Sequence, residues 1–137
     1  MLHAPNRRSV LQFAAAFGLV CATPVFAVSR QPAFNVFFDF ESAEMSEAAT
    51  ELADRIAQQM LPNARVILAG NADTAEAHPD RISYTRGNTV LKHFLRKPSL
   101  SRVRFNVLTN GTSSPLVRTG PNVREPQNRR VEIVLDL

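Results

Sequence analysis

Two side chains with opposite hydrogen-bonding capacity lie close together in the sequence. Asp73 ends the polar segment 70–73 (GNAD), and Arg86 follows within the segment 82–86 (ISYTR). A carboxylate only accepts hydrogen bonds, whereas a guanidinium only donates them, in a planar fork that is always charged. Such a pair can bind a molecule that carries both an ammonium and a carboxylate group.

Both side chains also have ordinary structural explanations. Asp73 could cap a turn, and Arg86 could be one of several solvated helix arginines. Arg86 is four residues from both Ile82 and Val90, however, so it leans toward the apolar face of its expected helix. An arginine there needs an anionic partner, and the sequence leaves open whether that partner is Asp73 or a ligand.

Two further polar segments lie at the ends of expected strands. Asp39 lies near the end of the first of these strands, and Arg129 and Arg130 precede the last one. The two arginines have two interpretations. From the residues alone both could be strand-edge charges that oppose aggregation, and the resemblance described below implies instead that one of them lines the same site as Asp73.

No catalytic set is recognisable among the side chains of this sequence. Its single cysteine is Cys21, and His78 and His93 have neither a partner histidine nor an acidic residue at metal-ligand spacing. The sequence also lacks a glycine-rich phosphate loop and a Gly-x-Ser-x-Gly motif. It therefore predicts a protein that binds without catalysis, with no metal and no cofactor.

Alternating strands and helices are expected to position these residues. Apolar residues recur at three- and four-residue steps in both helical segments, and Val103, Phe105 and Val107 alternate with polar residues as in a strand. This pattern predicts an α/β two-layer sandwich with the helices on one sheet. The expected elements, in order, are strand 34–40, a helix from its cap Ser46 to about Met60, strand 66–69, helix 80–95, strand 103–107, loop 110–127 and strand 131–135. In the second helix, Ile82, Val90 and Phe94 are expected to face inward.

The N-terminus has the pattern of an export signal. Arg7 and Arg8 precede the uncharged apolar stretch 10–27, which ends in small side chains, so we expect cleavage after Ala27 and one domain over 28–137. The alternative is a membrane anchor that is never cleaved. The paired arginines fit either a twin-arginine or a Sec signal, and a lipid anchor on Cys21 is a further alternative. Without such an anchor, the mature chain has no cysteine and no transmembrane helix.

The basic net charge depends partly on this leader. Removing residues 1–27 takes away Arg7 and Arg8 and lowers the net charge from +4 to +2. Binding to phosphate backbones usually needs a dense basic stripe, which this chain lacks. We therefore do not expect nucleic acid as a partner.

Four segments of the chain resemble the C-terminal domain of OmpA and the peptidoglycan-associated lipoproteins. The resemblance covers about residues 35–137 and implies a βαβαβ…β domain with helices packed on one mixed sheet. It implies a periplasmic protein, associated with the cell wall or the outer membrane, that binds peptidoglycan without covalent chemistry. The matching segments are 38–43 (FDFESA), 70–73 (GNAD), 82–86 (ISYTR) and 128–133 (NRRVEI).

The resemblance also assigns the site residues. In that family, an aspartate and a helix arginine hold the diaminopimelate of the peptidoglycan stem peptide, and these roles fall to Asp73 and Arg86. The other residues that the resemblance places at or beside the pocket are Asp39, Ser83, Arg129 and Arg130.

This chain departs from the family pattern at several positions of that site. Ala72 replaces a threonine, and Glu76 stands where a glycine is usual. Gly87 replaces an alanine after the helix arginine, which weakens a helix unless it permits close packing. The alternative function is therefore a degenerate domain of this fold that binds a protein partner in the envelope.

Overall fold

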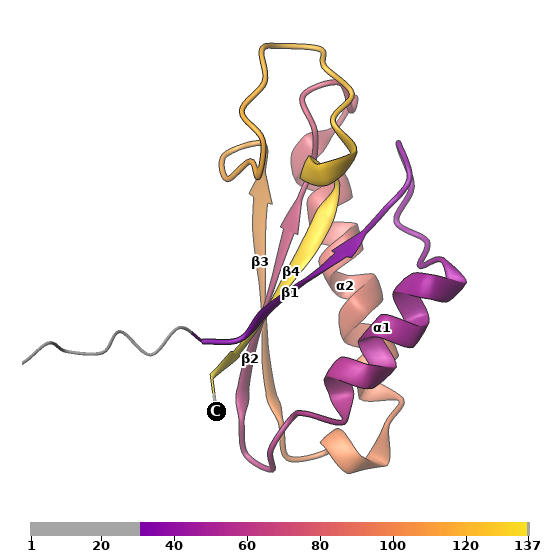
Figure 1. Ribbon diagram of the computed structural model, residues 1–137, viewed down its shortest axis with the longest axis vertical. Helices are drawn as coiled ribbons and strands as arrows, with labels where there is room; N and C mark the ends of the chain where they lie inside the picture. Colours follow the sequence, from indigo (N-terminus) through magenta and orange to yellow (C-terminus); the bar gives the residue numbers. More distant parts are fainter. Residues whose placement is uncertain (1–30, 137) are drawn as a thin grey trace, which may run out of the picture.

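The protein forms one mixed four-stranded sheet with two helices on one face (Figure 1). The computed structural model describes residues 31–136. The predicted signal 1–27 therefore lies outside the described residues, and the domain boundary at residue 28 stays a prediction. The elements are β1 (Ala33–Phe37), α1 (Glu47–Ala57), β2 (Arg65–Asn71), α2 (Pro79–Leu95), η1 (Pro98–Leu100), β3 (Arg104–Gly111), η2 (Pro126–Asn128) and β4 (Arg130–Asp136).

The last strand of the chain lies inside the sheet. The strand order is β1-β4-β2-β3, in which β4 pairs antiparallel with β1 and β2, and β2 pairs parallel with β3. Arg129, which directly precedes β4, and Arg130, its first residue, are 9% and 4% exposed. Their interpretation as strand-edge charges is therefore wrong, because β4 has a neighbour on both sides.

The hydrophobic core lies between the sheet and the helices. Ser46 caps α1 as expected, since its hydroxyl accepts a hydrogen bond from Ala49 N at 3.1 Å. In α2, Val90 and Phe94 are fully buried, but Ile82 is only half-buried. The prediction that Ile82 faces inward is wrong, because the buried positions of the first two turns of α2 belong to Ser83, Arg86 and Gly87.

Two glycines allow α2 to pack directly on the backbone of the sheet. A Cβ atom on Gly87 would lie 2.7 Å from a methyl carbon of Val107. A Cβ atom on Gly70 of β2 would lie 2.0 Å from the Ser83 carbonyl oxygen. Gly87 thus permits the close packing that the sequence left open, and Gly70 brings the first turn and a half of α2 against the end of β2.

Gly70→Ala is expected to lower the free energy of unfolding by about 3 kcal/mol, because backbone must move to relieve this overlap. Urea denaturation measures the loss. Gly120→Ala is the matched control, since its Cβ would meet nothing within 4 Å, and it should change stability by less than about 0.5 kcal/mol. Equal effects of the two substitutions would show that this contact does not limit the approach of α2.

The C-terminal ends of β1 and β2 meet the start of β4 and the N-terminal half of α2 at one end of the sheet. The long segment 112–125 leaves the end of β3, extends beyond the sheet and returns to β4 through η2 (Figure 1). All the predicted site residues lie on these elements or beside them. Among residues 31–136, no helix is long and apolar enough to cross a membrane.

Candidate binding site

Arg86 is the largest fully buried side chain among the described residues, and acceptors surround its guanidinium group. Its Nε donates to Ser42 O at 2.9 Å, and Nη1 donates to Asn71 O at 3.1 Å. Its Nη2 donates to Asp39 O at 3.0 Å. The remaining hydrogen bonds of Nη1 and Nη2 go to the two carboxylate oxygens of Glu76. Arg86 thus ties the ends of β1 and β2 to α2.

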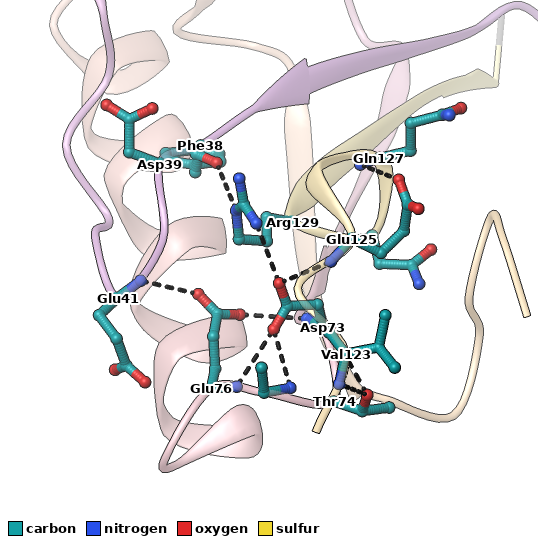
Figure 2. Close-up of polar contacts among 12 residues, drawn as sticks. Phe38, Asp39, Glu41, Asp73, Thr74, Glu76, Val123, Glu125, Gln127 and Arg129 are labelled. Atoms are coloured by element: carbon teal, nitrogen blue, oxygen red, sulfur yellow. Dashed lines mark hydrogen bonds and ion pairs between the residues drawn. The ribbon is translucent and has the colours of Figure 1, made fainter. Parts of the chain in front are cut away.

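The Glu76 carboxylate is held by four donors from three parts of the chain. Oε2 accepts from Arg86 Nη1 at 2.8 Å and from Asp73 N at 3.1 Å. Oε1 accepts from Arg86 Nη2 and from Glu41 N at 3.0 Å. Figure 2 shows the two backbone contacts of this carboxylate. The Glu76 side chain is fully buried, so these donors form a closed cradle for one carboxylate.

Asp73 is fully buried beside that cradle and also has four donors (Figure 2). Its Oδ1 accepts from Ala75 N at 3.0 Å and Glu76 N at 3.1 Å. Its Oδ2 accepts from Glu125 N at 3.1 Å and forms an ion pair with Arg129 Nη1 at 3.0 Å. Asp73 therefore joins the turn after β2 to the long segment before β4.

The anionic partner of Arg86 is Glu76, which sequence reasoning missed. That reasoning offered Asp73 or a ligand as the partner, whereas Asp73 pairs with Arg129. A usable signal was the Asp-x-x-Glu spacing. Asp73 accepts from Glu76 N while Glu76 accepts from Asp73 N, which is the reciprocal bonding of a capping box.

The other predicted site residues lie at the same end of the sheet in different surroundings. Asp39 is exposed, and its carboxylate is directed away from those of Asp73 and Glu76 (Figure 2). Ser83 is buried and donates to Pro79 O at 2.5 Å. Arg130 donates through Nη2 to Ser114 O at 3.1 Å, while its Nε and Nη1 have no acceptor among the described residues. The side chains of Asp73, Arg86 and Arg129 thus meet at one junction, in which Arg86 pairs with Glu76 and Arg129 with Asp73, whereas the side chains of the other three lie outside it.

A clasp between Glu41 and the turn after β2 covers the cradle. Glu41 N donates to Glu76 Oε1, and the Glu41 carboxylate accepts from Ala77 N at 2.5 Å. Glu41 has a φ of 52°, a left-handed conformation that costs a non-glycine residue energy. The two hydrogen bonds offset this cost. A surface hollow beside the clasp is lined by Glu41, His78, Arg81, Ile82 and Thr85.

The long segment before β4 forms the other wall of the site. Asn128 accepts from Leu116 N and Val117 N, and the Thr74 hydroxyl donates to Gly120 O at 2.7 Å. Arg129 Nε donates to Phe38 O at 3.1 Å, which joins this wall to the end of β1. The site is therefore a polar junction of three loops with its charges paired internally.

The hydrogen-bonding groups of this junction suit organic ions. No group of three or more histidine, cysteine or acidic side chains that could hold a metal ion occurs within residues 31–136. The acceptors and donors that converge there are two carboxylates, two guanidinium groups and backbone amides. Such groups exchange hydrogen bonds with carboxylates and ammonium ions.

Comparison with known sequences gives one relative that aligns over most of the chain. No family model matches. An outer membrane protein of Gluconacetobacter diazotrophicus is 34% identical over 112 residues, which cover 74% of this chain. The chain spans only 29% of the length of that relative.

Comparison with solved structures gives neighbours of the same architecture. The C-terminal domain of Helicobacter pylori MotB has a TM-score of 0.61 at 17% identity, over 76% of this chain and 86% of that one. The peptidoglycan-associated lipoprotein of Burkholderia pseudomallei has a TM-score of 0.60 at 20% identity, over 74% and 88%. An OmpA-like domain of Francisella tularensis has a TM-score of 0.50 at 14% identity, over 74% and 70%. At these identities the likeness shows a shared fold.

Proposed function

We propose that this chain, whose described part has the OmpA-like fold, binds peptidoglycan without covalent chemistry and recognises the diaminopimelate of the stem peptide. The fold predicted from the sequence is confirmed by the mixed sheet with two helices on one face and by the solved neighbours. The observation that carries the proposal is the cradle in which four donors converge on one carboxylate position beside the Asp73 carboxylate.

The chemistry of the ligand matches this pair of sites. Diaminopimelate carries an ammonium and a carboxylate at the end of its side chain. The Arg86 fork would take the carboxylate, and the Asp73 carboxylate would take the ammonium. Both groups already have internal partners, so each ligand contact replaces an existing one. Only the difference in strength contributes to affinity, and we expect a dissociation constant between about 1 μM and 1 mM.

A weak site suits a polymeric ligand. Peptidoglycan presents the same stem peptide repeatedly, so a tethered or self-associated domain gains avidity without further contacts. The proposal places the chain in the periplasm, exported by a Sec or twin-arginine signal and associated with the cell wall or the outer membrane. The outer membrane relative and the lipoprotein neighbour support this location.

A second candidate function is that of a protein-interaction module in the envelope. The specific observation in its favour is that Arg86 and Asp73 are fully buried and paired within the domain. A module of this kind would keep both ion pairs for stability and bind its partner through another surface. It would not distinguish between different stem peptides.

The test is cosedimentation of the purified protein with sacculi of two chemical types. Lysine has the ammonium of diaminopimelate but lacks the adjacent carboxylate. We therefore expect at least about tenfold weaker binding to lysine-type sacculi, which corresponds to the loss of one charge-assisted contact of about 1.5 kcal/mol. The double substitution Arg86→Met/Glu76→Met removes the ion pair as a unit and should abolish the preference.

Three outcomes separate the candidates. Preferential binding to diaminopimelate-type sacculi, reversed by free diaminopimelate, supports the proposal. Equal binding to both types would leave peptidoglycan binding but remove diaminopimelate as the recognised group. Failure of the wild-type protein to sediment with either type would favour the interaction module.

A further inference from the structure

We infer that Glu76 is an internal competitor of the ligand: in the free protein its carboxylate occupies the place that the ligand's carboxylate takes when it binds. The ligand must therefore displace the Glu76 side chain. For the identity of the ligand this inference rests on the proposed function. The existence of the cradle rests only on the hydrogen bonds to the Glu76 carboxylate.

The first argument is that the cradle is complete for any carboxylate. Arg86 presents Nη1 and Nη2 as a fork, and Asp73 N and Glu41 N add one donor to each oxygen. Two of these four donors are backbone amides in separate loops. Arg86 is also fixed by carbonyl groups of Ser42, Asn71 and Asp39. The guanidinium fork therefore keeps its position when the Glu76 side chain leaves, whereas Glu41 N belongs to the cover that must open.

The second argument is that Glu76 lies where it can move. It belongs to the irregular segment between β2 and α2, so its displacement breaks no ladder or helix hydrogen bond. Its cover is the Glu41 clasp, which consists of the hydrogen bonds Glu41 N to Glu76 and Ala77 N to Glu41. The hollow lined by Glu41, His78 and Arg81 adjoins this cover and offers the ligand an approach from solvent.

The consequence is a site whose affinity is set by its own side chain. When only a fraction of the molecules has an open cradle, the apparent dissociation constant rises by the inverse of that fraction. A cradle that is open in about one molecule in ten thus weakens binding about tenfold. A short side chain at position 76 should raise affinity for diaminopimelate by at least that factor.

Glu76→Ala should be less stable than the wild type even if the ion pair is purely structural. Loss of stability alone therefore does not distinguish a structural ion pair from an internal competitor of the ligand. The deciding property is rescue by a small carboxylate. Acetate should fill the vacated cradle of Glu76→Ala, and raise its melting temperature by about 4–8 °C at a concentration several times its dissociation constant, relative to chloride at equal ionic strength.

The controls are matched to this readout. Glu51→Ala removes an exposed glutamate of α1, and its melting temperature should respond to acetate as the wild type does. Arg86→Met/Glu76→Met lacks the guanidinium fork and should show no rescue. If Glu76→Ala is unfolded in chloride, acetate should restore its circular dichroism spectrum. Glu76→Gln keeps the volume of the side chain and should remain folded. Its melting temperature should also rise with acetate, but by less than that of Glu76→Ala.

The same variants distinguish this inference from the proposed function. Titration of free diaminopimelate into Glu76→Ala or Glu76→Gln should give at least about tenfold tighter binding than into the wild type. Absence of both acetate rescue and tighter binding would overturn the inference, even if wild-type protein sediments with sacculi. Rescue and tighter binding in a protein whose wild type does not sediment would uphold the inference and reject the proposed function.

Discussion

Arg86→Met is expected to lower the free energy of unfolding by about 3–5 kcal/mol, because it leaves the buried Glu76 carboxylate without its cation. The double substitution Arg86→Met/Glu76→Met should recover most of this loss, since two apolar side chains then fill the space of the pair. Urea denaturation of the wild type, both single variants and the double variant gives a complete cycle. Glu76→Met alone should cost a similar amount, because the unpaired charge is then that of Arg86.

The size of the coupling energy between Arg86 and Glu76 in this cycle decides the result. A double variant that is as unstable as the sum of the two single variants would show that the side chains act independently. That outcome would contradict the ion pair as the organising contact of the junction. It would also remove the double variant as a folded control in the binding experiments.

Asp73→Ala is expected to be about equally destabilising, at about 3–5 kcal/mol, because Arg129 loses its buried partner. Three backbone amides, of Ala75, Glu76 and Glu125, lose their acceptor as well. Hydrogen exchange should report the loss locally, through faster exchange of the Ala75 and Glu125 amides. Urea denaturation gives the global value.

Asp39→Ala is the matched control for this second prediction. Its carboxylate is exposed and directed away from the junction, so stability should change by less than about 0.5 kcal/mol (Figure 2). Asp73→Asn should be less harmful than Asp73→Ala, since an amide oxygen still accepts hydrogen bonds. A stable Asp73→Ala protein with unchanged exchange would mean that the ion pair with Arg129 contributes little.

The order of elements could be predicted from the sequence because burial leaves a periodic pattern. Val90 and Phe94 repeat at helical spacing, and Val131, Ile133 and Leu135 alternate as strand residues do. Each of these side chains is fully buried in the structure. The predicted first strand, 34–40, extends too far at its C-terminal end, because hydropathy does not show where pairing ends. β1 ends at Phe37. The next residue, Phe38, lies outside the strand and donates a hydrogen bond from its backbone N–H to Arg129 O.

The site could be predicted only in part, because polar side chains buried in pairs do not follow hydropathy. The need of Arg86 for an anion followed from its place on the helix and is confirmed by the ion pair with Glu76. The identity of the anion depended on how the turn after β2 folds back. In the sequence Glu76 stands out only as a departure from the family pattern, and hydropathy does not reveal its carboxylate as the partner of Arg86.

The position of β4 inside the sheet determines when the four-stranded sheet can form. β1 pairs only with β4 among the described strands, and β2 meets β1 only through it. The first and last of the described strands must therefore come together across about a hundred residues, which is a slow, non-local step. A nascent chain that still lacks β4 can pair β2 with β3, but its β1 has no neighbouring strand among the described residues. It stays open to proteases and chaperones until β4 has been synthesised.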